Sequence, residues 1–212
     1  MLTSLYLIGF AALPVLALDN GAEPGASCRP FDRRRRGFAL ADGAGALVLE
    51  TLDSARRRGA VPLAEVSGFG VSQDGFDLNR PLPDGSAAEA CMRLAVEEAG
   101  IEPQDVGAVN AHATGTVLGD LAEAAARVPV SSVKGALGHA MAAAGALEAI
   151  AAVLTCRHGV VPPTTNLADP DADCALDHVV GAPRAADARR VLTVSFGMGG
   201  QNAALLLERP RP

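Results

Sequence analysis

Residues 106–123 read VGAVNAHATGTVLGDLAE, a short apolar segment that leads through a loop of small residues into a helical pattern. The apolar run predicts a buried strand over 106–111, and the stretch after the loop predicts a short helix over 120–127. His112 lies in the loop, at a strand-to-helix junction. Strands that alternate with helices indicate an α/β fold, with helices layered on a mixed sheet.

The same alternation continues through the rest of the chain. The predicted helices cover 51–58, 86–99 and 138–157. The predicted strands cover 37–50 (as a pair or as one bent strand), 64–71, 128–132, 190–196 and 202–208. The last two strands read as a hairpin around a glycine turn.

Composition and charge limit the class of protein. Apolar residues make up 49% of the 212 residues and charged residues 20%, which is typical of a globular chain that buries one domain or two fused halves. The formal net charge of −6 argues against nucleic acid as the main partner. The four cysteines show no CxxC pairing, so neither disulfides nor a metal site are predicted, and a cytoplasmic location is expected.

An apolar run, Leu5–Leu18, stands near the N-terminus. A secretory signal would carry a basic region, and no basic residue precedes Asp19. The run is also too short to span a bilayer. It is therefore predicted as a buried helix, with a signal peptide as the less favoured alternative, and no membrane partner is expected.

His112 and His139 are the candidate catalytic residues. His139 lies in SSVKGALGHAMAAAGALEA, residues 131–149, at the predicted first turn of the helix over 138–157. The positive end of a helix lowers the pKa of an imidazole, so a histidine there stays neutral and can exchange protons. A single histidine at a helix start is more often a cap or a packing residue. Two of them, each among small residues that leave room for a ligand, favour a site.

Five motifs occur in the order and approximate spacing of one enzyme family. They are NAHATGT at 110–116, Lys134 five residues before His139, SFGMGGQN at 195–202, CRPFD at 28–32 and the glycine-rich stretch 37–50. On these motifs the chain resembles the β-ketoacyl synthases, the condensing enzymes of fatty-acid and polyketide assembly, from about Leu5 to Leu207. Any one of the motifs is weak alone, but five in register are specific.

The resemblance implies a thiolase-like fold, a layered αβαβα sandwich of two similar α/β halves. Residues 1–62 would be the end of the N-terminal half and residues 63–212 the C-terminal half, completed by a partner chain. The family loads an acyl group onto a cysteine, decarboxylates a malonyl thioester and joins the two by Claisen condensation. Its substrates ride on the phosphopantetheine of an acyl carrier protein, so no separate cofactor is expected.

The matching positions assign roles to residues of this chain. His112 and His139 would drive decarboxylation and stabilise the enolate, with Lys134 and Glu123 setting their protonation. Thr114 and Thr116 match positions that hydrogen-bond the phosphopantetheine arm. A surface ion pair, for the charged residues, and simple turn residues, for the threonines, remain the alternatives.

The stretch Phe196, Gly197, Met198 and Gly199 matches the glycine turn that closes over the acyl pocket. The amide of Met198 would complete an oxyanion hole. The family usually has phenylalanine at this position, where it gates the pocket, and methionine is thinner and more flexible. Gating and chain-length control are therefore expected to differ in this chain.

Larger departures concern the nucleophile and one helix. None of the four cysteines lies at the strand-to-helix turn that holds the family's reactive thiol, and none has an evident basic neighbour. The link between Glu123 and Val130 is also shorter than the family's, which implies a trimmed helix.

These departures leave three hypotheses for function. The first is a split synthase, in which a partner chain with the N-terminal half provides the thiol and the two chains form a hetero-oligomer. The second is a non-catalytic partner comparable to chain-length factors. The third is a histidine-only decarboxylase or dehydratase of carrier-bound substrates.

The basic run at 33–36 is either a docking surface for the acidic carrier protein or a solvated loop.

Overall fold

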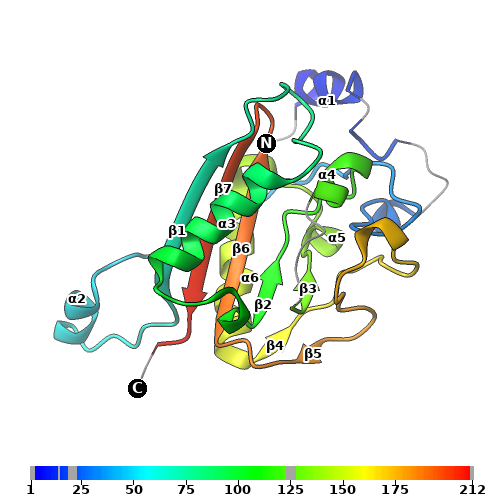
Figure 1. Cartoon of the computed structure of the whole chain (residues 1–212). Coiled ribbons are helices and arrows are strands. Elements are labelled where there is room, and N and C mark those ends of the chain that lie inside the picture. The colour runs from blue at the N-terminus through cyan, green and yellow to red at the C-terminus, as the bar shows by residue number, and fades with distance from the viewer. Residues whose placement is uncertain (1–2, 14, 19–22, 123–127, 211–212) are drawn as a thin grey trace.

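The computed structural model describes residues 3–13, 15–18, 23–122 and 128–210. Its centre is a five-stranded mixed sheet in the order β1-β7-β6-β2-β3 (Figure 1). The middle strand β6 pairs in parallel with β2 and antiparallel with β7. The strands are β1 (Glu65–Gln73), β2 (Ala108–Asn110), β3 (Val130–Ser131), β6 (Arg190–Gly197) and β7 (Gln201–Glu208). The predicted α/β class and the C-terminal hairpin are confirmed.

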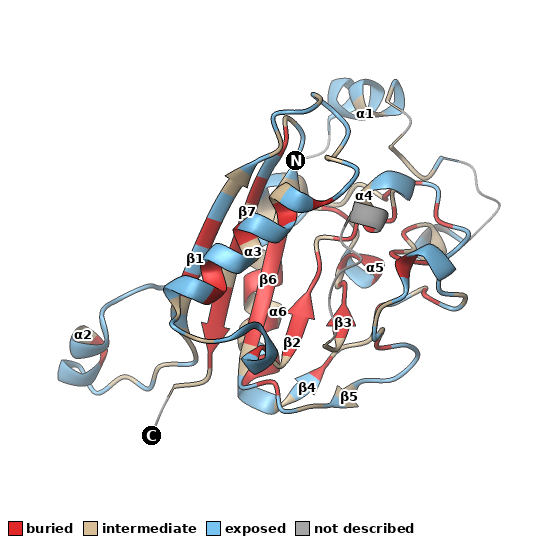
Figure 2. Cartoon of the chain, in the orientation of Figure 1, coloured by how far each residue is buried: buried red, intermediate tan, exposed pale blue. Residues whose placement is uncertain are grey.

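The long helices α3 (Ser86–Glu98) and α6 (Ala144–His158) cover opposite faces of this sheet. Side chains alternate along β6, so Leu192 and Val194 join the core under α3 while Val191 joins the core under α6. Residues 191–194 of β6 are all buried, because helices lie on both faces of the sheet there. Figure 2 shows most of β6 as buried.

Helix α3 lies unusually close to β1 because two glycines face it. A Cβ atom at Gly68 would stand 1.9 Å from the carbonyl oxygen of Ala95, and one at Gly70 would stand 2.0 Å from that of Cys91. No side chain fits in that space. The two glycines therefore set the distance between the helix and the sheet.

Short elements join these layers. They are α1 (Ser4–Ala11), α2 (Leu52–Arg57), α4 (Val117–Ala122), α5 (Lys134–Leu137), a two-stranded sheet of β4 (Val160–Val161) and β5 (Arg184–Ala185), and 3₁₀ turns at Pro24–Ala26, Pro103–Asp105, Met141–Ala143 and Ala172–Cys174. Helix α4 begins three residues before the predicted start at 120, and residues 123–127 lie outside the described part of the chain.

The prediction that His139 occupies the first turn of a long helix is wrong. The stretch over 134–158 is divided into α5, a 3₁₀ turn and α6, because Gly138 takes a left-handed φ of +70° and ends α5. His139 then pairs in an extended bridge with residues 39–41, donating its N–H to the Ala39 oxygen at 2.7 Å. It therefore stands before the start of α6.

Two predictions for the first fifty residues are also wrong. The apolar run near the N-terminus forms a helix only over Ser4–Ala11, and none of that helix is buried. Residues 41–50 are extended but belong to no strand, and Val48 and Leu49 are 88% and 76% exposed. The backbone pairing with His139 ends at Ala41, whose N–H donates to the His139 oxygen at 3.1 Å, and no described strand lies beside the residues that follow. No helix among the described residues is long and apolar enough to cross a membrane.

Candidate active site

A cavity of about 870 Å³ opens where β2 and β6 end. The two predicted catalytic histidines line it, together with the predicted threonine pair and the glycine turn after β6. The cavity wall also includes the end of β1 and parts of the polar loop that follows it, Asp74 and residues 79–82. The structure therefore brings together, in one site, all of the predicted site residues that it describes except Lys134, which lies behind the histidines.

The two histidine rings face each other at the wall of this cavity. Their centroids are 5.4 Å apart and their planes cross at 83°. His112 sits two residues beyond the end of β2, and His139 is held by its bridge to residues 39–41. Phe38 packs edge-on against His139, with ring centroids 5.0 Å apart. The pair is thus fixed by three separate segments of the chain: the end of β2, residues 38–41 and the stretch that holds His139.

Lys134 is almost fully buried, and its partner is Glu148 in α6. Its ammonium forms a close ion pair with one carboxylate oxygen of Glu148 and lies 3.2 Å from Nδ1 of His112. The other oxygen of Glu148 accepts a hydrogen bond from Ser195 Oγ at 3.3 Å. Glu123, the predicted partner, lies outside the described residues.

Both histidines expose the same kind of hydrogen-bond donor. An ammonium group has only N–H donors, so Nδ1 of His112 must accept from Lys134. Nδ1 of His139 accepts the backbone N–H of Met141 at 3.3 Å. A neutral imidazole that accepts at Nδ1 carries its proton on Nε2. Each histidine therefore has an Nε2–H group with which to donate to a bound oxygen.

The surroundings keep both histidines neutral. Burial and the nearby Lys134 cation lower the pKa of His139 to about 3. The same two causes, with His139 as a third, hold the pKa of His112 well below its usual value. The expected neutrality is therefore present, but it comes from burial and Lys134, since neither histidine lies within a helix.

The glycine turn after β6 forms another wall. Phe196 places its ring 5.9 Å from that of His112, and Met198 is 42% exposed at the cavity mouth. Gly200 has a φ of +77°, and a Cβ atom there would stand 2.7 Å from the Cβ of Asp74. Asp74 also accepts a hydrogen bond from the Asn202 amide at 2.6 Å. The turn is therefore clamped to the polar loop that follows β1.

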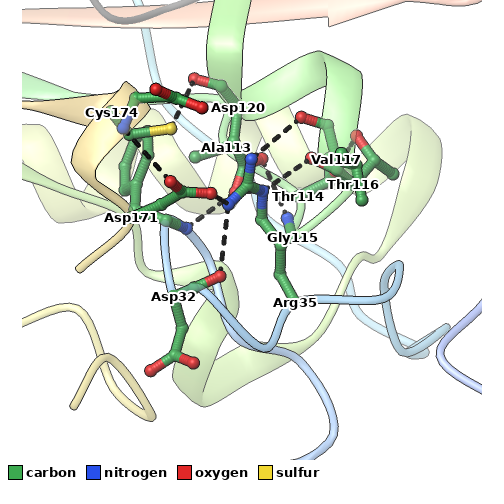
Figure 3. Close-up of polar contacts among 12 residues, drawn as sticks. Asp32, Arg35, Ala113, Thr114, Gly115, Thr116, Val117, Asp120, Asp171 and Cys174 are labelled. Carbon is green, nitrogen blue, oxygen red and sulfur yellow. Dashed lines mark hydrogen bonds and ion pairs between the residues drawn. The ribbon is translucent and has the colours of Figure 1, made fainter. Parts of the chain in front are cut away.

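Buried charges hold the loop over 113–117 (Figure 3). The guanidinium of Arg35, a residue only 4% exposed, donates to the backbone oxygen of Thr116 at 3.3 Å. Asp120 is fully buried, accepts the N–H of Gly115 at 3.0 Å and lies 3.7 Å from Arg35. Thr114 donates to the Thr116 hydroxyl at 3.2 Å, so the two predicted phosphopantetheine ligands are neighbours.

The arginine run at 33–36 is divided by the fold. Arg35 points inward, whereas Arg33 and Arg34 are exposed and pair with neighbouring aspartates. Within this basic run, Arg35 therefore stabilises the fold, and the charges of Arg33 and Arg34 are balanced by aspartates.

The four cysteines do not supply a nucleophile to this site. All are buried, and burial raises the pKa of each thiol to about 11. None of them is among the described residues that line the cavity. Within the described part of the chain, no cluster of His, Cys, Asp or Glu could hold a metal ion.

Sequence reasoning missed several residues of the site. Glu148 is the only acidic residue of α6, and an isolated glutamate in an alanine-rich helix was an available signal. The roles of Arg35, Asp120 and Asp74 depend on contacts between segments far apart in the chain, which no local pattern reveals.

Comparison with known proteins connects this geometry to one family. The model described as "Beta-ketoacyl synthase, C-terminal domain" matches residues 63–168, and that described as "Beta-ketoacyl synthase, N-terminal domain" matches residues 1–55. The chain is 42% identical over 211 residues to 3-oxoacyl-[acyl-carrier-protein] synthase 2 of Mycobacterium tuberculosis, covering 96% of the chain and 51% of that protein. The corresponding protein of Rhizobium meliloti is 40% identical, with 96% and 50% covered. The chain thus spans about half the length of these relatives.

Solved structures of ketosynthases have the same fold as this chain. A β-ketoacyl synthase from Burkholderia phymatum superposes with a TM-score of 0.93 at 38% identity, covering 99% of this chain and 53% of that one. The ishigamide ketosynthase/chain length factor gives 0.91 at 37% identity, with 99% and 52% covered. These likenesses confirm the thiolase-like architecture and its extent of about one half. The chain belongs to the β-ketoacyl synthase family.

Proposed function

We propose that this chain supplies the decarboxylating histidine pair of a β-ketoacyl synthase. The observation that carries the proposal is the convergence of two neutral histidines, each with an Nε2–H donor, on one cavity wall. Residues 63–212 would serve as the C-terminal half of the enzyme and residues 1–62 as the end of the N-terminal half. The nucleophilic thiol would come from sequence outside this chain, on a partner polypeptide.

The chemistry needs two oxygen-stabilising donors. When the malonyl thioester loses carbon dioxide, the electrons of the broken C–C bond move onto the thioester and form an enolate. The Nε2–H groups of His112 and His139 would donate to the developing enolate oxygen in a water-poor site. The enolate carbon then attacks the acyl thioester, a C–C bond forms, and the thiolate of the cysteine leaves.

Lys134 would act through the histidines. Its ammonium keeps His112 unprotonated at Nδ1, and it is itself held by Glu148. The amide of Met198, in the turn over the cavity, would stabilise the oxyanion formed on the acyl carbonyl.

Thr114 and Thr116 would bind the phosphopantetheine arm of an acyl carrier protein. Both line the cavity, and their loop is fixed by Arg35 and Asp120. One of the similar solved structures is described as a type II polyketide synthase acyl-carrier protein in complex with its ketosynthase, and it superposes with a TM-score of 0.93 at 31% identity. Free, buried cysteines suit a reducing cytoplasm.

Two uncovered apolar surfaces support a complementary half. Val48 and Leu49 project from the extended segment at 41–50, and Phe69 and Val71 of β1 are about half exposed. Among the described residues, these side chains of β1 and of the segment at 41–50 are therefore left uncovered. Surfaces of this kind are typical of a protein interface.

The test is reconstitution with an N-terminal ketosynthase half that carries the reactive cysteine. The assembled protein should condense an acyl thioester with malonyl-carrier protein, and His112→Ala or His139→Ala should lower kcat by about a hundredfold to a thousandfold. Leu118→Ala, an exposed position on α4, is the matched control and should leave kcat unchanged. Full condensation by a His112→Ala assembly would favour a non-catalytic role like that of a chain-length factor.

A second candidate function follows from the lack of a described cysteine at the cavity. The histidine pair alone could decarboxylate a carrier-bound malonyl group without a covalent intermediate. Release of carbon dioxide by this chain without any thiol-bearing half, abolished by His112→Ala, would support that function over the split synthase.

A further inference from the structure

The loop that carries Thr114 and Thr116 depends on a residue outside the cavity. Arg35 is 4% exposed and is not among the described residues that line the catalytic cavity. Its guanidinium donates to the backbone oxygen of Thr116 at 3.3 Å and to that of Val117 at 3.0 Å. Figure 3 shows the guanidinium between this loop and Asp171. The backbone of the loop is therefore held by a side chain that does not line the cavity.

The contacts of Arg35 use the planar shape of its guanidinium. Besides the two loop oxygens, Nη1 donates to the Asp32 backbone oxygen at 3.2 Å and to Oδ2 of Asp171 at 2.5 Å. A guanidinium offers five N–H donors in a fixed plane, whereas a lysine ammonium offers three on a flexible stem. Asp171 is itself held, because its N–H donates to the Phe31 oxygen at 2.9 Å. Lysine in place of Arg35 would therefore keep the charge but lose part of this set of bonds.

The two threonine hydroxyls leave a donor for a ligand. The Thr114 hydroxyl donates to that of Thr116 at 3.2 Å, so the O–H of Thr116 can donate to an acceptor in the cavity. Gly119 gives this hydroxyl its space, since a Cβ atom there would stand 2.4 Å from Oγ1 of Thr116. The position of the hydroxyl therefore follows from the backbone of the loop, which Arg35 fixes.

We propose that Arg35 and Asp171 are positioning residues that make the reaction depend on the pantetheine arm of its substrate. The inference rests on the proposed function and deepens it, because it names the part of the substrate whose recognition these two residues control. Arg35 orients the Thr116 hydroxyl toward the arm through the loop backbone, and Asp171 holds the guanidinium in place.

The histidine pair does not share these anchors. His139 is held by its bridge to Leu40, and Nδ1 of His112 lies beside the Lys134 ammonium. Neither contact includes the guanidinium of Arg35. A change at Arg35 should therefore weaken recognition of the arm and leave the decarboxylation of a bound malonyl group intact.

Two malonyl thioesters test the proposal in the assembled protein. Malonyl-pantetheine carries the arm, whereas the S-ethyl thioester of malonic acid has none of the arm's amide or hydroxyl groups. Arg35→Lys should lower the ratio of kcat/KM for carbon dioxide release from the first thioester to that from the second by about tenfold, the effect of one or two lost hydrogen bonds. A higher KM for malonyl-pantetheine should account for the change, with kcat for the S-ethyl thioester unaltered.

A second variant keeps the test open if Arg35→Lys does not fold. Asp171→Asn changes a side chain that is 21% exposed and removes only the charge that holds the guanidinium. It should lower the same ratio, by less than Arg35→Lys. Arg34→Lys is the matched control, since it makes the same exchange at the exposed neighbouring arginine, and it should leave the ratio unchanged.

Thr116→Val separates this inference from the proposed function, because it removes the arm contact directly. A lower ratio in Thr116→Val, together with unchanged ratios in Arg35→Lys and Asp171→Asn, would overturn the inference and leave the proposed function standing. Equal losses for both thioesters in Arg35→Lys would also overturn it, because they would indicate a purely structural role. No carbon dioxide release from either thioester by the unaltered assembly would overturn the proposed function itself.

Discussion

The histidine site and the extended segment at 41–50 lie side by side, yet they differ in almost every physical respect. Around the site, charged groups are buried and each has a partner, as with Lys134 and Glu148. Along the segment, apolar side chains such as Val48 face outward, and the described backbone joins no sheet. Leu40 links the two regions through its bridge to His139.

The difference separates contacts that close within this chain from surfaces that stay uncovered. The buried charges around the histidines are paired because their partners come from segments within the chain. The apolar covering is incomplete, since one face of the segment packs against α6 through Gly43 and Gly45 while the other face is bare. Catalytic geometry and structural closure are therefore separable in this molecule.

The largest expected effect comes from breaking the buried ion pair. Lys134→Met should cost about 3–5 kcal/mol in unfolding free energy, because it leaves the Glu148 carboxylate buried without its cation. Urea unfolding measures this. Arg58→Met, which removes an exposed pair with Glu50 near the open segment, is the control and should have a far smaller effect.

The double variant Lys134→Met/Glu148→Leu should recover most of that stability but none of the activity. Equal losses from Lys134→Met and Arg58→Met would contradict the distinction between the two regions.

The next effect is on the pH dependence of stability. His139 has a pKa of about 3 in the folded protein, against 6.5 when unfolded, so the unfolded chain binds the extra proton. The stability this contributes is present above pH 6.5 and is lost as the pH falls toward 3, by at most about 1.4 kcal/mol per pH unit. His139→Gln should remove that slope between pH 4 and 6, for a total near 3 kcal/mol.

Asp120 changes the unfolding free energy with pH in the opposite direction to His139, so its contribution has to be separated from that of His139. Burial raises its pKa from 3.8 to about 6, so its contribution is lost as the pH rises through 6. Comparing His139→Gln with the unaltered protein cancels this contribution. Parallel stability curves for the two proteins would show that His139 is not buried as a neutral group.

Substitutions in the extended segment at 41–50 should change the affinity for the complementary half but hardly the stability of the chain alone. Val48→Asp places a charge on a residue that is 88% exposed, so the unfolding free energy of the chain alone should hardly change. If the complementary half covers this position, affinity for that half should fall about tenfold or more, since valine burial is worth roughly 1.5 kcal/mol or more. Titration calorimetry checks this. Unchanged affinity would exclude Val48 from the interface.

The smallest effect concerns the glycine turn. Gly200→Ala should cost about 1–2 kcal/mol, because the residue has a φ of +77° and the new Cβ would press on Asp74. Gly199→Ala meets no atom within 4 Å and should show only the strain of its φ of +85°. Differential scanning calorimetry on both variants separates the contact from the strain, and equal shifts in Tm would mean that the clamp to Asp74 is weak.

The sequence was sufficient for the elements whose signal is local. The hairpin of β6 and β7, helix α3 and the loop after β2 all follow from apolar periodicity and glycine positions, and the motifs located both histidines. The start of α6 was missed because the alanines at 140 and 142–144 extend the helical pattern back to Gly138, where a left-handed φ ends α5. The residue that follows, His139, pairs with Leu40, a contact almost a hundred residues away in the chain that no local pattern indicates.

Burial was the harder quantity to predict. The N-terminal apolar run and the segment at 41–50 have the composition of core elements. Composition alone, however, does not predict whether another part of the structure packs against them. Glu148 shows the converse, since a charged residue in an otherwise apolar helix is buried only because Lys134 reaches it from another segment.

The guanidinium of Arg35 has one more implication, for the order in which the protein is made. It joins the carbonyl groups of the loop after His112 to the carboxylate of Asp171, a residue 136 positions further along the chain. During synthesis that loop lacks one of its anchors until Asp171 has left the ribosome. Thr114 and Thr116 should therefore take their final positions among the last steps of folding, after α3 has packed on β1.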